Sequence, residues 1–345
     1  MMEKNTDRLF WTLTSIIVGA LLLTISAKAF PQVTSSIVKP ISGIVKQSDK
    51  TNHGADNAAK DAFNAKYKLD NSTSTNDNST KENAKSADTL GFSVSDNGDG
   101  TGTITGYDTN YGLNVNIPEY MKLNGKPLKI IDIGDSAFMA SGITSISIPD
   151  SVTKIEEFAL YQNPFTQITL PSHLVSIGEQ AFGNNMLSNI VIPNSVIQID
   201  NAAFTNGQLK SVTLPNGIKN INDSVFYANK ITNIQIPNSV TSIGYRAFAH
   251  NNLSTLTLPN NVTTIGSESF AQNDLKSIKL SSSLTTISNS SFFGNDLTNV
   301  EIPTSVNSIQ DYAFSNNDFT SISIPKYVTN LKKSAFDDTV KITRN

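Results

Sequence analysis

The sequence predicts a repeat solenoid, a fold in which short coils of similar sequence stack in a row. The main observation is a unit of 22 residues that recurs without insertions from about Ile133 to Phe336. A large apolar residue, a proline and an asparagine each return at a fixed place in this unit. Each coil of such an array covers the apolar side of the next one, so the core grows with the number of coils.

Phenylalanine marks one place in the unit, and Leu160 stands in the one unit where it is missing. The residue before it is usually small, as Ala247 is before Phe248, which suits a tight turn. We therefore expect a short helical or 3-10 return segment with phenylalanine as the large filler of the core. The phenylalanines are Phe138, Phe182, Phe204, Phe226, Phe248, Phe270, Phe292, Phe314 and Phe336.

An alternating apolar segment precedes a proline in most units. Leu253, Leu256 and Leu258 can point inward from a strand, and Pro259 then ends it because proline cannot donate to a ladder. This L-x-x-L-x-L spacing, in units of about 20 to 29 residues, is typical of leucine-rich repeats. The predicted fold is therefore a leucine-rich-repeat solenoid with a parallel sheet on its concave face.

Asparagine occupies a third fixed place, and Gly207 interrupts the series once. A buried amide can satisfy backbone groups at the bend of its own coil and in the neighbouring coil. We predict that this ladder is structural. Its members are Asn163, Asn185, Asn229, Asn251, Asn273, Asn295 and Asn317.

Residues 1–29 have the pattern of an export or anchoring segment. An uncharged stretch at 9–27 follows Arg8, and as a helix it would measure about 28 Å, close to the ~30 Å core of a bilayer. Two interpretations stay open. The segment is either a signal peptide cleaved near Ala29, which would release the protein, or a retained transmembrane anchor.

Residues 30–89 are expected to form a juxtamembrane segment followed by a disordered linker. The part from residue 48 onward is rich in Asn, Ser, Thr, Asp and Lys and poor in bulky apolar residues. Such a segment cannot bury enough apolar area to offset the entropy lost on ordering. It would tether the solenoid away from the membrane.

Residues 90–132 are expected to be an N-terminal β cap, and 133–345 the solenoid with a charged C-terminal cap. Alternating apolar residues flank the run 96–100, whose Asp, Asn and Gly residues favour a hairpin turn. A cation-binding loop is the weaker alternative, because Gly98 and Gly100 stand where a calcium loop needs oxygen ligands.

Composition argues against several classes of function. The chain has no cysteine, which excludes thiol nucleophiles, disulfides and thiolate metal sites, and its formal net charge of −3 offers no argument for nucleic acid. The three histidines are far apart in sequence. We predict no catalytic residues, no cofactor and no metal, and therefore a non-enzymatic protein. Separately, we expect a monomer.

The outward positions of the predicted strands are the candidate partner-binding residues. They are polar, nearly uncharged and free of aromatic rings. Lys279 and Glu301 are expected to form a cross-strand ion pair, and Tyr161, Tyr227, Tyr245 and Tyr312 are alternative contact points on the return side. The candidate residues in the middle of the array are Asn233, Gln235, Thr255, Thr257, Ser277, Lys279, Asn299 and Glu301.

Over about 133–336 the repeat resembles that of the BspA-like leucine-rich-repeat family of bacterial surface proteins. The shared sequence pattern is L-x-x-I-x-I-P-x-S-V-x-x-I-G-x-x-A-F-x-x-N. Asn-x-Leu replaces the family's usual Cys-x-x-Leu, so each unit is one residue shorter. The resemblance implies an extracellular protein that adheres to a protein or glycan of a host or of another cell. The alternative is a structural module that organises the producer's own envelope.

Overall fold

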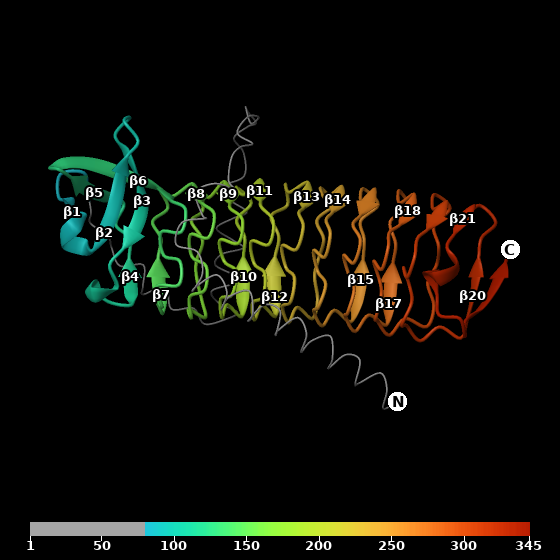
Figure 1. Cartoon of the computed structure of the whole chain (residues 1–345). Helices are drawn as coiled ribbons and strands as arrows, with labels where there is room; N and C mark the ends of the chain where they lie inside the picture. Colours follow the sequence, from blue (N-terminus) through green and yellow to red (C-terminus); the bar gives the residue numbers. More distant parts are fainter. Residues whose placement is uncertain (1–79) are drawn as a thin grey trace, which may run out of the picture. The chain divides into compact units, whose positions relative to one another are not determined.

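The computed structural model describes residues 80–345, which form a row of stacked coils behind a β-rich cap (Figure 1). The predicted signal peptide or anchor (1–29) and most of the predicted linker (30–79) lie outside the described residues. No helix within 80–345 is both long and apolar enough to cross a membrane.

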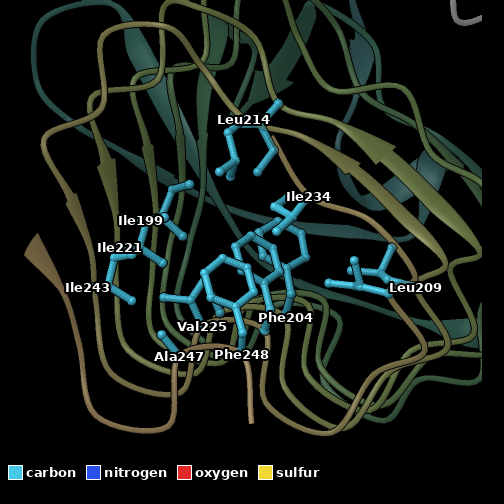
Figure 2. Packing of buried hydrophobic residues seen from close by; sticks show 14 of the residues in the cluster. Ile199, Phe204, Leu209, Leu214, Ile221, Val225, Ile234, Ile243, Ala247 and Phe248 are labelled. Atoms are coloured by element: carbon cyan, nitrogen blue, oxygen red, sulfur yellow. The ribbon is translucent and has the colours of Figure 1, made fainter. Parts of the chain in front are cut away.

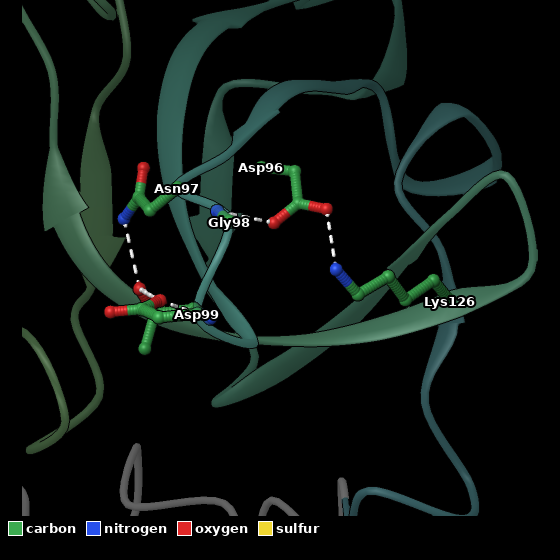
Figure 3. Close-up of polar contacts among 6 residues, drawn as sticks. Asp96, Asn97, Gly98, Asp99 and Lys126 are labelled. Atoms are coloured by element: carbon green, nitrogen blue, oxygen red, sulfur yellow. Dashed lines mark hydrogen bonds and ion pairs between the residues drawn. The ribbon is translucent and has the colours of Figure 1, made fainter.

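The cap contains a hairpin whose turn is closed by its own side chains (Figure 3). Asp96 accepts the N–H of Gly98 at 2.8 Å and the ammonium of Lys126 at 2.6 Å. The hairpin interpretation of 96–100 is thus confirmed. The cap elements are β1 (Lys85–Ser86), η2 (Asp88–Leu90), β2 (Phe92–Asp96), β3 (Thr101–Tyr107), η3 (Thr109–Tyr111), β4 (Asn114–Asn116), β5 (Tyr120–Leu123) and β6 (Lys126–Ile133).

Two rows of short parallel strands run along the array, and the cap starts both, because β4 pairs with β7 and β6 pairs with β8. The first row contains β7 (Ser145–Ser147), β10 (Asn189–Val191), β12 (Ser211–Thr213), β15 (Thr255–Thr257), β17 (Ser277–Lys279), β20 (Ser321–Ile324) and β22 (Lys341–Arg344). The second row contains β8 (Lys154–Ile155), β9 (Ser176–Ile177), β11 (Gln198–Ile199), β13 (Asn220–Ile221), β14 (Ser242–Ile243), β16 (Thr264–Ile265), β18 (Thr286–Ile287), β19 (Ser308–Ile309) and β21 (Asn330–Leu331).

Where neighbouring coils of the array pair, equivalent residues lie opposite one another. Thr255 lies opposite Ser277 in the first row, and Ser242 lies opposite Thr264 in the second. Both separations equal the 22-residue period of the sequence. The parallel-sheet solenoid predicted from the repeat is therefore confirmed.

The phenylalanines form a continuous stack in the core (Figure 2). From Phe182 to Phe336, neighbouring rings in the series have centroids 5.1–5.7 Å apart and interplanar angles of 4–17°. Leu160 separates Phe138 from this stack. Because each ring contacts one ring on either side, the burial of one coil depends directly on its two neighbours.

The return segments are turns rather than the expected helical or 3-10 segments. Around Phe248, both Arg246 and His250 have left-handed backbone, with φ of 53° and 57°. The Phe248 N–H donates to Ser269 of the next coil at 2.8 Å instead of bonding within its own segment. Hydrogen bonds to the next coil thus alternate with turn bonds inside the coil, such as Ala249 N–H to the Arg246 carbonyl at 3.1 Å, and no continuous helix forms. Among residues 133–345 the one 3-10 helix is η4 (Lys333–Ala335).

The asparagines form the predicted structural ladder. The Nδ2 group of Asn251 donates to the carbonyl oxygens of Phe226 and Phe248, at 2.9 and 3.1 Å, while its Oδ1 accepts the N–H of Ile231 at 3.0 Å. Asn251 is buried. Each such amide therefore joins two consecutive coils through groups that have no access to water.

Candidate functional site

The eight candidate residues lie together on one exposed surface, which we call the strand face: Asn233, Gln235, Thr255, Thr257, Ser277, Lys279, Asn299 and Glu301. The residues between them point inward; Leu256 in β15 is 3% exposed. Thr255 is paired with Ser277 and Thr257 with Lys279 in a regular parallel ladder. The centre of the strand face is therefore held by a rigid backbone.

The outer parts of the strand face have a different backbone. Within the described residues, the first row contains no strand at 167–169, 233–235 or 299–301, which are three coils apart. Asn233 and Gln235 are nevertheless exposed, and Ile234 between them is buried. Inward and outward residues thus still alternate where the hydrogen-bonded strand ladder is interrupted.

The expected ion pair between Lys279 and Glu301 is absent. The three ion pairs within 80–345 are Lys126–Asp96, Lys129–Glu119 and Arg246–Glu268. The ladder does not continue from β17 to 299–301, so Lys279 and Glu301 are not cross-strand partners. Both side chains remain exposed, and each can meet a group on a binding partner.

The strand face offers hydroxyl, amide, one ammonium and one carboxylate group. These can donate and accept hydrogen bonds, but they do not combine a nucleophile with a base. Within residues 80–345, no cluster of three or more His, Asp or Glu side chains could hold a metal ion. These groups are suited to polar contacts with another molecule.

A second group of side chains lies on the return side, where Arg246 is bound by Glu268 and flanked by aromatic rings. The Arg246 Nε atom lies 2.7 Å from Glu268 Oε2. The guanidinium carbon lies 4.8 Å from the ring centre of Tyr245 and 5.9 Å from that of Tyr227. His250 meets the Tyr227 ring edge-on, with centroids 5.3 Å apart. We call these five residues the return cluster.

Burial governs the titration of the half-buried members of the return cluster. It lowers the pKa of His250 below its usual value, and the charge of Arg246 lowers it further. It raises the pKa of Tyr227. Both side chains are therefore held in their neutral forms, while Arg246 and Glu268 carry opposite and compensating charges.

Sequence reasoning found this cluster only in part. Tyr227 and Tyr245 were expected contact points, but the ion pair was missed. The available signal was that Arg246 and Glu268 have opposite charges and stand one period apart. Of the other two tyrosines, Tyr312 is 53% exposed, whereas Tyr161 is 9% exposed and does not fit the expectation. Tyr161 packs edge-on against Phe158 and accepts a hydrogen bond from Asn184.

These features define a leucine-rich-repeat solenoid with two candidate contact surfaces. A family model described as a BspA type leucine rich repeat region of six copies matches residues 131–253 and 219–343. The chain therefore belongs to the BspA-type leucine-rich-repeat family, as the resemblance of its repeat predicted. A search of curated proteins gave no match.

Similar solved structures are bacterial leucine-rich-repeat proteins. One is a leucine rich cell surface protein from Faecalibacterium prausnitzii, at 23% identity and a TM-score of 0.37 over 74% of this chain and 93% of that one. Another is the pneumococcal vaccine antigen PcpA, at 21% identity and a TM-score of 0.49 over 74% and 68%. A third, from Bacteroides ovatus, has 18% identity and a TM-score of 0.39 over 74% and 98%.

Proposed function

We propose that this chain is a non-catalytic cell-surface protein that binds a protein partner through the strand face. The observation that carries the proposal is the row of eight exposed polar side chains, of which the central four lie on a laddered backbone. A backbone that is already ordered loses little conformational freedom on binding, which favours association. The leucine-rich-repeat fold itself supports a role in protein interaction.

The chemistry of the strand face suits a polar partner surface. It lacks the Trp, Tyr and Arg anchors that dominate tight interfaces. Binding therefore rests on many hydrogen bonds and on the separate charges of Lys279 and Glu301. We expect modest affinity for one partner molecule and stronger attachment where the partner is repeated on a surface, through avidity.

We further propose that the solenoid acts outside the cell. The pattern of residues 1–29 and the family support this location. Either the segment 9–27 stays in the membrane, or cleavage near Ala29 releases the protein. The N-terminal residue of the mature protein separates these outcomes: Phe30 means release and Met1 means retention.

A second candidate function is organisation of the producer's own envelope. The absence of aromatic residues from the strand face favours it, since a spacing module needs no anchor residues. Deletion of the gene would distinguish the two. Loss of adhesion with an unchanged envelope supports the first function, and an altered envelope with unchanged adhesion supports the second.

The test of the first function is a binding assay of the full-length chain on immobilised fibronectin, fibrinogen, collagen and laminin, and on intact epithelial cells. We expect saturable binding to at least one of these, and its loss when Thr255, Thr257, Ser277 and Lys279 are all changed to Ala. Exposed Ser254 and Lys276, which lie outside the strand face, provide the matched control variant. Absence of saturable binding to every surface would overturn the proposal.

A further inference from the structure

We propose that the return cluster is a second binding site that takes a neutral saccharide, independent of the protein-binding role given to the strand face. The ring of Tyr245 would stack against the apolar face of one sugar. The groups of Arg246 and Glu268 that point to solvent would hydrogen-bond the sugar hydroxyls. The inference rests on the geometry, the exposure and the charge balance of these side chains.

The exposed aromatic ring is the first requirement for such a site. Tyr245 is 39% exposed, although its backbone is fixed on both sides. Its N–H donates to Asp223 Oδ1 at 2.7 Å, and its carbonyl accepts the N–H of Ser224 at 2.8 Å. The Arg246 guanidinium lies over one face of the ring, so a sugar would stack on the opposite face.

Unused hydrogen-bonding capacity is the second requirement. Arg246 donates its Nε–H to Glu268, and within residues 80–345 its terminal nitrogens have no hydrogen-bond acceptor. Glu268 Oε1 has only a long contact of 3.4 Å from the Tyr245 hydroxyl. The two side chains are 40% and 33% exposed, so both keep contact with solvent.

The packing of two coils keeps these groups in register. At Gly266 an added Cβ would lie 2.5 Å from the Tyr245 nitrogen, so the coil carrying Glu268 touches the coil carrying Tyr245. A side chain at position 266 would require a local shift of the two backbones. The backbones that carry Tyr245 and Glu268 are therefore in close contact.

Charge balance decides which class of ligand fits. Arg246 and Glu268 neutralise one another, and Asp223 adds a negative charge beside Tyr245. An anionic ligand would meet two carboxylates, and a cationic one would meet the guanidinium near the ring. A neutral sugar is repelled neither by the carboxylates nor by the guanidinium. Its C–H face matches an aromatic ring, and its neighbouring hydroxyls both donate and accept.

Saturation-transfer difference NMR on the full-length chain tests this inference. The probes are the methyl glycosides of glucose, galactose, mannose, N-acetylglucosamine and N-acetylgalactosamine, with glucuronic acid and N-acetylneuraminic acid as charged probes. We expect at least one neutral glycoside to bind, with the strongest saturation on the protons of one ring face. Tyr245→Ala should weaken binding by about tenfold or more, and Glu268→Gln by about fivefold.

Matched variants keep the result interpretable. Tyr312→Ala removes another exposed tyrosine and should leave glycoside binding unchanged, as should the fourfold strand-face variant. Tyr245→Leu keeps an apolar side chain of similar reach but lacks the ring, so it replaces Tyr245→Ala if that variant fails to fold. Binding of the charged probes alone, binding of no probe, or unaltered binding in both Tyr245 variants would each overturn the inference.

Discussion

The side-chain amide of Asn251 donates to the carbonyl oxygen of Phe226, 25 residues earlier in the chain, at 2.9 Å. The same amide also donates to Phe248 in its own coil. One buried side chain thus joins the backbones of two coils at the place where each carries its core phenylalanine. Stability of the array depends on such contacts between neighbours, and it is these contacts that hold the exposed surfaces in place.

Replacing Asn251 by Ala should destabilise the array strongly. The N–H of Ile231 and the carbonyls of Phe226 and Phe248 would lose a buried partner, at about 1–3 kcal/mol for each unsatisfied group. We expect a total loss of at least about 3 kcal/mol in urea unfolding. Asn252→Ala, at the exposed neighbouring position, should change stability by no more than about 0.5 kcal/mol. Equal effects of the two substitutions would refute the structural role of the ladder.

Truncation of Phe248 should damage the array locally. Phe248→Ala removes a ring packed between Phe226 and Phe270 and should cost about 3–5 kcal/mol. Because coils contact only their neighbours, hydrogen-exchange protection should fall most in the adjacent coils. Phe248→Leu should cost less, since Leu160 fills the equivalent place in another coil. Uniform loss of protection along 133–345 would be incompatible with this expectation.

Two buried hydroxyls should be dispensable. Ser269 and Ser291 stand where most coils have alanine, and their Oγ atoms are buried without a hydrogen-bond partner. Changing either to Ala should raise stability by about 1 kcal/mol, because an unsatisfied polar group is removed. Ser281 is the control. Its Oγ donates to Val262 at 2.6 Å, so Ser281→Ala should instead lower the unfolding free energy. A lower melting temperature for Ser269→Ala or Ser291→Ala, or a higher one for Ser281→Ala, would contradict the account.

Glycine should stabilise the return segment at position 228. Ala228 has a φ of 53°. The same place in a later coil is occupied by Gly294, with a φ of 68°. A left-handed conformation costs a side-chain-bearing residue about 1–2 kcal/mol, and glycine costs about 0.5–1 kcal/mol in backbone entropy. Ala228→Gly should therefore stabilise slightly, and Gly294→Ala should destabilise. Urea midpoints that shift in the reverse directions would show that these φ values are not strained.

The fold was predictable because its determinants repeat. The Phe, Pro and Asn positions keep one period, so a single unit specified the coil, its inward residues and the amide ladder. The left-handed returns were not predictable in this way. Their strained positions carry residues such as Ala228, Arg246 and Tyr312 rather than glycine, and the hydrogen bonds that stabilise them come from the next coil.

The candidate surfaces were predictable to different degrees. Alternation along each strand gave the exposed residues of the strand face correctly. Whether neighbouring coils form a ladder depends on the geometry of the stack, which is why the expected Lys279–Glu301 pair was wrong. The return cluster draws its residues from three coils, and sequence order alone does not show that Arg246 turns toward Glu268.

Acid should weaken the coils around His250 in particular. Burial lowers the pKa of His250, so the unfolded chain binds its proton more readily than the folded chain does. The stability that comes from neutral His250 is complete above the ordinary histidine pKa of about 6.5 and is lost as the pH falls below it. Between pH 7.5 and 5.5, His250→Gln should therefore lose less unfolding free energy than the unaltered chain. Identical pH profiles for His250→Gln and the unaltered chain would refute the assignment.

The central claim is that the strand face makes the contact with the protein partner. Hydrogen exchange of the full-length chain, free and bound to any matrix protein that retains it in the binding assay, tests this claim most directly. The account predicts slower exchange at Thr255–Thr257 and Ser277–Lys279 on binding, with little change at the return segment 245–250. Protection confined to the return segment or to the cap, with the strand face unchanged, would contradict it.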